Sequence, residues 1–517
     1  MLQTEDYIRQ FKSELPQFQE MTEKFYQKEV DLKTYKGFSG RYGSYAQRGG
    51  NANMLRLRLN SGRLTKDKFK FICDMIDMYQ IDKIHVTTCQ TIQLHNLAPQ
   101  AVYGIMEKAI DHQIITWGGG GDFPRNVMTS PLSGVEQGEY FDVLPYAQAA
   151  ADYLLTLINT IKMPRKLKVG FSNSPANSTH ATFRDLGFVA REDQTFDVYS
   201  AGGLGANPKM GLLVASKVEP SKILYYIKAM TEVFMAHGNY ENRAKARTRY
   251  MQDVLGKEGY IKTFQETLDR VMSSGVMMDI HPDAISFQKQ GNGTTTSGPR
   301  ILPQKQSGLY TVCYHPIGGT PSIPKMKELC HAILPMEDVE LRLSPDESIY
   351  IINCNAAEAN QLCELTDDGA RNVFETSVAC IGASICQVGM RDSQKLMRTL
   401  VEETRKYNFS DGVLPKIHIS GCPSSCGTHQ IGSLGFHGGI KLIEKQPKPA
   451  FTLHVNGCDL QGKERFGENW GVILEEDIPS FLIELGKQIQ ADGAVFETWL
   501  PTHMEDLKRI AASYIQK

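Results

Sequence analysis

Long hydrophobic runs are missing from this 517-residue sequence. No stretch approaches the roughly 18 uninterrupted apolar residues that an ordinary membrane-spanning helix needs. An excess of charge of one sign is also missing, since 56 Lys and Arg face 58 Asp and Glu, which argues against a nucleic-acid-coating polycation. Residues 1–18 mix charged with apolar positions and lack the hydrophobic run of a signal peptide. We therefore expect a cytoplasmic protein that binds neither nucleic acid nor membrane.

Cysteine is sparse, with 11 residues, too few for a disulfide framework in a chain of this length. Four of them form two close pairs: Cys380 and Cys386 have five residues between them, and Cys422 and Cys426 have three. Four thiolates in two pairs can hold a cubane iron–sulfur cluster. Zinc is the competing occupant, although its structural sites favour pairs with two to four intervening residues. Four unrelated core cysteines are a third interpretation.

The chain is long enough for roughly three to four domains, and one structural pattern occurs in it twice. Alternation at residues 54–59 predicts a strand, followed by a helix over 69–79 and a strand over 83–94. A similar order returns later in the chain. Its predicted elements are a strand over 308–315, a helix over 324–333 and strands over 339–343 and 348–352. The repeat predicts two pseudo-equivalent halves, joined by the Gly- and Thr-rich residues 290–299.

The segment from Ile419 to Gly427 (ISGCPSSCG), preceded by Cys380 and Cys386, resembles the signature of the sulfite and nitrite reductases that couple a 4Fe-4S cluster to sirohaem. The resemblance extends over nearly the whole chain from about residue 37. It implies an α+β fold, a pseudo-two-fold duplicated chain with two ferredoxin-like half-domains and two sirohaem/4Fe-4S-binding domains. It further implies that Cys426 is shared between cluster and sirohaem iron, whereas Cys380, Cys386 and Cys422 hold the cluster alone.

The pattern and the resemblance together predict five segments. An amphipathic arm comes first, because apolar residues recur at helical spacing among many charges near the start of the chain. The predicted segments are the helical arm (1–36), the first ferredoxin-like half-domain (37–115), the first sirohaem-binding domain (116–289), the second ferredoxin-like half-domain (300–370) and the 4Fe-4S cluster and sirohaem domain (371–517).

A six-electron reduction of a small oxyanion needs cations that hold the anion and a group that donates protons near neutral pH. The family-matching positions are Arg56, Arg125, Lys166 and Lys168. In an extended chain Lys166 and Lys168 point the same way, about 7 Å apart. Crowded cations lower one another's pKa, which makes a lysine a better acid. The alternative for each residue is a solvated charged surface.

Sirohaem carries eight carboxylates, and the resemblance assigns it further contacts. Residues 237–250 are similar to the family's basic helix, which provides arginines for carboxylate pairing; a solvated helix is the alternative. Glycines at 202–205 permit close backbone approach. Two departures from the family pattern are Cys89, where Arg is common, and Ser424, where Asn is frequent. The cofactor-binding residues implied are Thr87, Thr88, Gln90, Gln93, Gly203, Arg243, Arg247 and Arg249.

Lys168 stands where plant-type nitrite reductases usually present Asn. Sulfite is divalent near neutral pH and nitrite monovalent, so the extra cation favours sulfite. Nitrite reduction to ammonia is the alternative, because residues 380–393 also look like nitrite-reductase versions of the motif. No G-x-G-x-x-G after a strand and no P-loop occurs. We therefore expect electrons from another protein, ferredoxin first and a flavoprotein second.

A function of another class is a non-catalytic iron–sulfur or zinc protein. It accounts for the four cysteines but leaves the oxyanion-type cations and the duplication unexplained.

Overall fold

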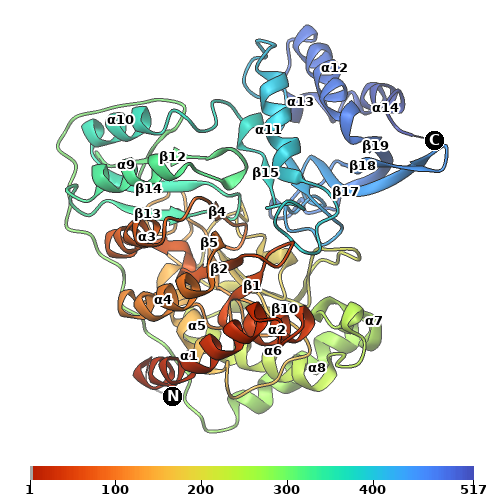
Figure 1. Ribbon diagram of the computed structural model, residues 1–517. Coiled ribbons are helices and arrows are strands. Elements are labelled where there is room, and N and C mark those ends of the chain that lie inside the picture. The colour runs from red at the N-terminus through yellow and green to blue at the C-terminus, as the bar shows by residue number, and fades with distance from the viewer. Residues whose placement is uncertain (1–3, 517) are drawn as a thin grey trace.

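The computed structural model describes residues 4–516, in which helices pack around four β-sheets (Figure 1). The first sheet is antiparallel, in the order β1-β2-β5-β4. Its helices α3 and α4 share one apolar core with the fully buried Leu55, Leu57 and Leu59, as the alternating pattern predicts. The elements are β1 (Ser44–Ala46), β2 (Asn53–Arg58), β4 (Ile84–Val86), β5 (Thr91–Leu97), α3 (Lys66–Tyr79) and α4 (Pro99–Ala109).

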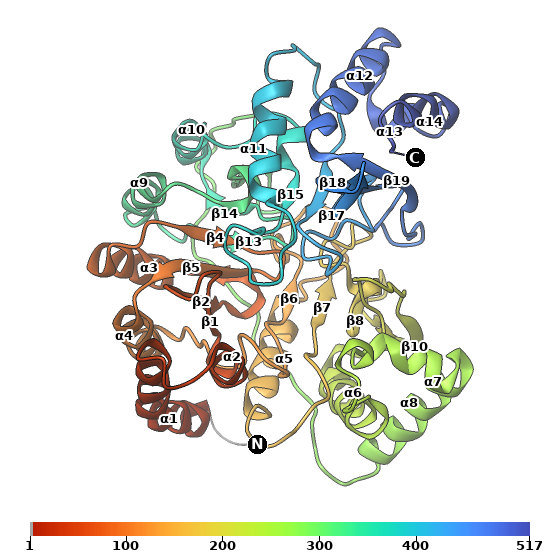
Figure 2. The same ribbon diagram turned by 45° about the vertical axis from the view of Figure 1, so that its right-hand side comes forward.

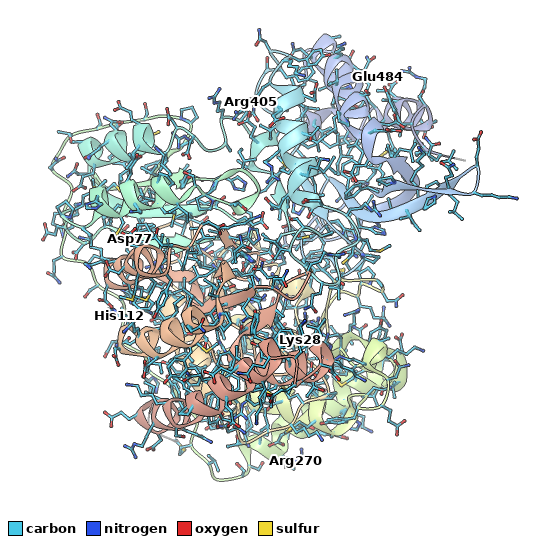
Figure 3. All side chains as sticks on the ribbon, in the orientation of Figure 1. Lys28, Asp77, His112, Arg270, Arg405 and Glu484 are labelled. Atoms are coloured by element: carbon cyan, nitrogen blue, oxygen red, sulfur yellow. The ribbon has the colours of Figure 1, made fainter. Side chains whose placement is uncertain are left out.

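The second sheet repeats this unit later in the chain, in the order β11-β12-β14-β13-β3. Its edge strand β3 comes from the N-terminal half, and Arg63 on that strand pairs with Glu340 at 2.8 Å. Asp77 of α3, labelled in Figure 3, pairs with Lys327 of α9 at 2.6 Å. The two ferredoxin-like units are therefore joined side by side. The elements are β3 (Arg63–Leu64), β11 (Ile301–Pro303), β12 (Tyr310–Tyr314), β13 (Glu340–Leu343), β14 (Ile349–Cys354), α9 (Ile323–Ile333) and α10 (Ala356–Leu365).

The third and fourth sheets have the same topology, β6-β7-β8-β9-β10 and β15-β16-β17-β18-β19. In each, the first two pairings are parallel and the last two antiparallel. The α+β duplicated fold is thus confirmed. The strands are β6 (Met128–Thr129), β7 (Val169–Ser172), β8 (Leu186–Ala190), β9 (Phe196–Ser200), β10 (Leu212–Val218), β15 (Val378–Ala379), β16 (Ile417–Ser420), β17 (Leu434–Ile443), β18 (Gln446–Val455) and β19 (Glu468–Leu474).

Each of these two sheets packs against its own helices through a separate apolar core (Figure 2). Helices α5 (Leu144–Thr156), α6 (Ile223–His237), α7 (Met251–Leu255) and α8 (Lys257–Met272) accompany the third sheet. Helices α11 (Ser393–Thr404), α12 (Ile478–Ala491), α13 (Phe496–Trp499) and α14 (Met504–Ala512) accompany the fourth.

The N-terminal residues form helices α1 (Thr4–Tyr26) and α2 (Leu32–Ser39), and α1 lies between α4 and α2 (Figure 2). Phe11, Leu15 and Phe18 of α1 are buried there, so the predicted amphipathic pattern covers part of the first core. Residues 276–297 contain no helix or strand and lead into the second half. Within residues 4–516, no helix is both long and apolar enough to span a membrane.

Two local expectations are wrong. Residues 83–94 do not form one strand but belong to β4 and β5, which a turn joins. The backbone amide of Gln90 donates to the Thr87 carbonyl at 2.9 Å and closes that turn. Residues 237–250 form short 3-10 turns rather than a helix. Asn239 and Asn242 accept backbone N–H bonds there, which competes with helix formation.

Candidate functional site

Lys166 and Lys168 lie on an extended segment that runs beside Arg125. The Arg125 amide donates to the Leu167 carbonyl at 2.9 Å, and Leu167 is fully buried. Because successive side chains of an extended chain point to opposite faces, both lysines project from the face opposite Leu167. Arg56 joins them from β2: its guanidinium and that of Arg125 both donate to the Gly119 carbonyl. Two guanidinium groups thus converge on one acceptor.

Burial and crowding lower the pKa values of Lys166, Lys168 and Arg125. Burial holds the pKa of Lys166 well below its usual range, and the charges of Lys168 and Arg125 act in the same direction. Burial likewise lowers the pKa of Lys168, and that of Arg125 to about 10. A lysine with a lowered pKa exchanges its proton nearer to neutral pH.

Cys89 contacts this cation cluster, with its sulfur 3.2 Å from Lys168 Nζ. Burial alone would raise the pKa of Cys89, but the charges of Lys168 and Arg184 lower it to about 6. Cys89 is therefore mainly a thiolate at neutral pH. Arg184 is 6% exposed and adds a further buried positive charge that the sequence did not single out.

The cluster has more positive charge than its protein surroundings balance. In the part of the chain that the structure describes, no carboxylate pairs with the site cations Arg56, Arg125, Lys166, Lys168 and Arg184. Among the buried guanidinium nitrogens that lack a hydrogen-bond partner in the described residues are Arg125 Nε, Arg184 Nη2 and Arg247 Nε at this site. Buried donors without acceptors are costly. The site therefore fits an anionic group, such as the carboxylates of a sirohaem or a bound oxyanion.

The four cysteines come together at the ends of β15 and β16. These strands pair in parallel, so their carboxyl ends meet at one edge of the sheet. Cys380 directly follows β15, and the loop that carries Cys422 and Cys426 follows β16. The Gly421 amide donates to the Cys380 sulfur at 3.2 Å. Burial raises the pKa of Cys426, and the charges of Cys422 and Cys386 raise it further, which places the thiols near one another.

The spacing of these sulfurs favours a cluster over zinc. Among residues 4–516, the cysteine quartet is not one of the groups of three or more side chains whose ligand atoms could converge on a single metal ion. One tetrahedral zinc with Zn–S bonds of about 2.3 Å would hold its sulfurs about 3.8 Å apart. A cubane spreads the sulfurs more widely, because each thiolate binds a different iron atom. The quartet therefore fits the 4Fe-4S cluster.

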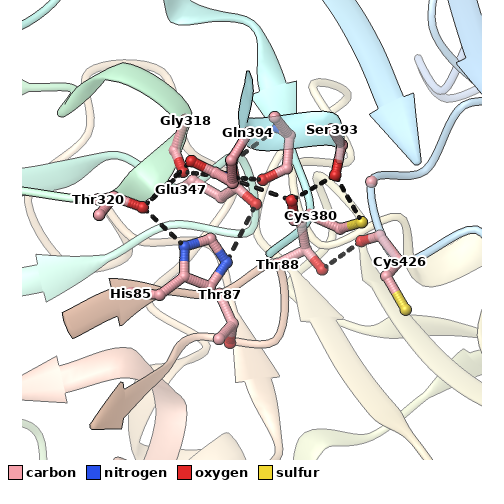
Figure 4. Close-up of polar contacts among 12 residues, drawn as sticks. His85, Thr87, Thr88, Gly318, Thr320, Glu347, Cys380, Ser393, Gln394 and Cys426 are labelled. Carbon is pink, nitrogen blue, oxygen red and sulfur yellow. Dashed lines mark hydrogen bonds and ion pairs between the residues drawn. The ribbon is translucent and has the colours of Figure 1, made fainter. Parts of the chain in front are cut away.

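The cysteines and the N-terminal cations meet at Cys426. Lys166 and Lys168 are close enough that their charges counteract the rise in its pKa. The Thr88 hydroxyl donates to the Cys426 carbonyl at 2.8 Å (Figure 4). Arg48 donates to the Cys386 carbonyl at 3.2 Å. The two halves of the chain thus contribute to a single site.

A buried network of polar side chains hydrogen-bonds the backbone of Ala379 and Cys380 (Figure 4). Ser393 donates to the Cys380 carbonyl at 2.6 Å, and the Gln394 amide donates to the Ala379 carbonyl at 2.6 Å. The Ala379 amide in turn donates to Glu347 at 3.0 Å. Burial raises the pKa of Glu347 well above its usual range. Sequence reasoning singled out none of these side chains: Ser393 and Gln394 lie at the end of the cysteine segment, and Glu347 lies in another part of the chain.

The remaining predicted residues have varied surroundings. Thr87 bonds to Thr91 at 2.7 Å, and Gln93 is buried opposite Arg56 in the β2–β5 pair. The side-chain amide of Gln90 bonds within the protein at both ends. Its nitrogen donates to the carbonyls of Thr129 and Leu343 at 2.8 and 2.6 Å, and its oxygen accepts from the Thr129 backbone amide. We therefore interpret Gln90 as a residue that joins loops rather than one that faces a cofactor.

The predicted arginines each have a partner within the protein. Arg243 is largely exposed and binds Asp122 through two nitrogens, at 2.6 and 3.1 Å. Arg247 binds Asp185 at 2.9 Å, while its Nε is free. Arg249 is buried, and a Cβ on Gly203 would lie 3.3 Å from its side chain. Arg247 lies near the cation cluster, since its charge acts on Lys166 and Lys168. Arg249 lies near Arg247, whereas Arg243 is held at the surface.

Comparisons with known proteins agree with this geometry. Two family profiles match: "Nitrite/Sulfite reductase ferredoxin-like half domain" at residues 45–111 and "Nitrite and sulphite reductase 4Fe-4S domain" at residues 120–272. The ferredoxin–nitrite reductase of Synechococcus elongatus is 24% identical over 84% of this chain and 85% of its own length. The NADPH sulfite reductase hemoprotein beta-component of Staphylococcus haemolyticus is 23% identical over 84% and 81%. The solved structure of the Mycobacterium tuberculosis NirA protein has the same fold, with a TM-score of 0.76, 22% identity and 92% coverage of both chains.

Proposed function

We propose that this chain reduces sulfite to sulfide with six electrons. The premise is that the chain belongs to the nitrite and sulfite reductase family and carries sirohaem and a 4Fe-4S cluster. The observation that carries the proposal is the cation cluster of Arg56, Arg125, Lys166 and Lys168, which no carboxylate in residues 4–516 balances. A divalent anion gains more than a monovalent one from each added cation. Lys168 is the cation that separates the two substrates in the family pattern.

The four cations have different tasks in this proposal. When bound, the sirohaem coupled to the cluster supplies the electrons at an iron atom. Arg56 and Arg125 hold the substrate oxygens, because their shared contact with Gly119 fixes both guanidinium groups. Lys166 donates protons from Nζ, since burial and the neighbouring cations lower its pKa. Lys168 supplies charge next to the substrate.

Nitrite is the second candidate substrate. The thiolate of Cys89 lies 3.2 Å from Lys168 and offsets part of its charge, which weakens the preference for a divalent anion. Several similar proteins are ferredoxin–nitrite reductases. We keep sulfite first, because one thiolate offsets only part of the cluster's charge and no carboxylate in residues 4–516 pairs with Lys166, Arg56 or Arg125.

The test compares kcat/KM for sulfite and for nitrite with dithionite-reduced methyl viologen as donor. We expect the wild type to favour sulfite and Lys168→Asn to lose about tenfold more efficiency with sulfite than with nitrite. Lys162→Asn, at a nearby exposed position, is the matched control and should change neither value. A wild type that favours nitrite would overturn the assignment.

Lys166→Met tests the proton donor separately. We expect both cofactors to remain bound, as judged by absorption, while kcat falls strongly. Unchanged turnover would remove Lys166 from the mechanism.

We infer that a separate protein delivers the electrons, with ferredoxin as the first candidate. One similar protein is named a ferredoxin-dependent sulfite reductase and another an NADPH-dependent hemoprotein component. Reduced ferredoxin should support turnover, whereas NADPH alone should not. Turnover with NADPH alone would contradict this inference.

A further inference from the structure

Three histidines lie together beyond the cysteine loop. Ligand nitrogens of His429, His437 and His454 all lie within 4.8 Å of one another. His437 is on β17 opposite Thr452, and His454 is two residues further along β18. Because residues two apart on a strand share a face, the two rings are diagonal neighbours on one side of the sheet. His429 reaches them from the loop that follows Cys426.

Hydrogen bonds orient two of the three rings. Ser420 Oγ lies 3.0 Å from His429 Nδ1, which leaves His429 Nε2 available. His454 hydrogen-bonds the backbone of Gly467, and its Nε2 lies 2.9 Å from His437 Nδ1. Metal-binding histidines commonly use one ring nitrogen for such a bond to a carbonyl or side chain, and this bond directs the other nitrogen toward the metal. His429 has this form, and His454 takes it when a metal ion replaces the hydrogen bond between His454 Nε2 and His437.

The histidines are also in the correct protonation state to bind a metal ion. Burial lowers the pKa of His429 to about 2 and that of His437 to about 4, and the charges of neighbouring histidines act in the same direction. The pKa of His454 is lowered as well, again mainly by burial. All three are neutral at pH 7, and only a neutral imidazole can donate its lone pair to a metal. No carboxylate pairs with any of them in residues 4–516.

We propose that His429, His437 and His454 form a zinc-binding site distinct from the cysteine quartet. Zinc accepts three imidazole ligands and a fourth ligand such as water, and His437, being only partly buried, leaves one side open to solvent. His429 is three residues from Cys426, so the ion would tie the cysteine loop to β17 and β18. The proposed role is structural support of that loop. The inference does not depend on the choice between sulfite and nitrite.

The test uses the purified holoenzyme with Zn²⁺ as the probe. The protein is treated with a chelator, dialysed against Zn²⁺, passed through a desalting column and analysed for zinc and iron. We expect one zinc per chain in the wild type and almost none in His437→Gln or His454→Gln, with iron content unchanged. The matched control, His331→Gln at an exposed histidine, should retain its zinc. Zinc retained equally by all variants would overturn the proposal.

Zinc X-ray absorption of the wild type provides a test that needs no variant to fold. We expect a shell of nitrogen or oxygen ligands at about 2.0–2.1 Å with the multiple scattering typical of imidazole. A sulfur shell at about 2.3 Å would place the zinc at cysteines instead. That result, or a wild type that retains no zinc, would leave the three histidines as a hydrogen-bonded cluster only and would overturn the site.

Discussion

Cys89 is a single residue that changes the charge of the whole cation cluster. With a pKa of about 6 beside Lys168, it is about nine-tenths thiolate at pH 7. A negative charge at this point opposes the binding of an anionic substrate. The family pattern, in which Arg is common at this position, would place a positive charge there instead.

We therefore predict that Cys89→Ser strengthens substrate binding. Removal of one nearby charge is worth on the order of 1 kcal/mol, or roughly a fivefold lower KM for sulfite. Steady-state kinetics measures the change, and Cys363→Ser, at a cysteine packed against the first core, is the control. A KM that rises or stays constant would show that the thiolate does not face the substrate.

The buried His315 leads to a prediction of how the free energy of unfolding depends on pH. It is 2% exposed, and burial lowers its pKa to about 4, whereas an unfolded histidine titrates near 6.5. Between these values the unfolded chain binds a proton that the folded chain does not. Stability should therefore fall as pH drops from about 6.5 toward 4, by up to about 1.4 kcal/mol per pH unit for this residue.

Denaturant titrations between pH 7.5 and 5 test this prediction. His315→Gln should flatten the slope of stability against pH, and His331→Gln, at an exposed histidine, should leave it unchanged. An unchanged slope in His315→Gln would mean that other groups set the acid sensitivity.

Among the elements, those with a strong periodic pattern are predictable from sequence. Alternating leucines predict β2, and the apolar spacing of residues 69–79 predicts most of α3. The turn before β5 and the 3-10 turns after α6 are not predictable in this way. They are set by single contacts, such as the Thr87–Thr91 bond and the Asn239 caps, that leave no periodic signal.

In the candidate site, too, some residues are predictable from the sequence and others are not. A motif identifies the cysteines, and family-matching positions identify the four cations. Arg184 and Glu347 are missed, because tertiary contacts between distant segments bring them to the site. Ser393 and Gln394 end the cysteine segment, but no pattern in the sequence marks a hydroxyl or an amide there as a contact of Cys380. Conversely, a motif match cannot tell a cofactor contact from a positioning contact, and Gln90 shows the difference.

Gln90 joins the turn before β5 to two other elements, and we predict that Gln90→Ala weakens the fold. It leaves the buried carbonyls of Thr129 and Leu343 without their donor, at a cost of about 2–4 kcal/mol. Urea denaturation measures the loss, and Gln19→Ala, at an exposed position of α1, is the control. Folded Gln90→Ala should keep its sirohaem; a stable variant that loses sirohaem would show a direct cofactor contact instead.

At the scale of the whole molecule, the duplication explains why one copy alone holds the cluster. The loops after β7 and β16 have matching backbones, with positive φ at Asn177 and Ser425 and again at His180 and Thr428. Along these matched loops, Ser174 and Ser178 occupy the places of Cys422 and Cys426. Serine hydroxyls are poor ligands for iron–sulfur clusters, which are held by thiolates.

The matched copies also differ in charge. Lys168 precedes β7 as Lys416 precedes β16, yet only Lys416 has a carboxylate partner, Asp346 at 2.5 Å. Lys416 and Asp346 line a cavity of about 620 Å³ between the two halves of the chain, to which Ser178 and His180 of the first half also contribute. The charge of Lys416, followed by that of His315, lowers the pKa of Asp346 against the effect of burial. A carboxylate therefore balances the charge of Lys416 in this copy, whereas no carboxylate among the described residues balances the charge of Lys168 in the other.

This difference leads to a prediction for Asp346→Asn. The substitution leaves Lys416 partly buried without its counter-charge, so we expect a loss of about 1–3 kcal/mol of stability. Activity should stay near the wild-type value, because the pair belongs to the copy without the cation cluster. In Asp346→Asn with Lys416→Met, part of the stability should return, since no unpaired charge remains. Denaturation and methyl viologen assays measure both quantities, and a double variant as unstable as the sum of its parts would show that the two charges act independently.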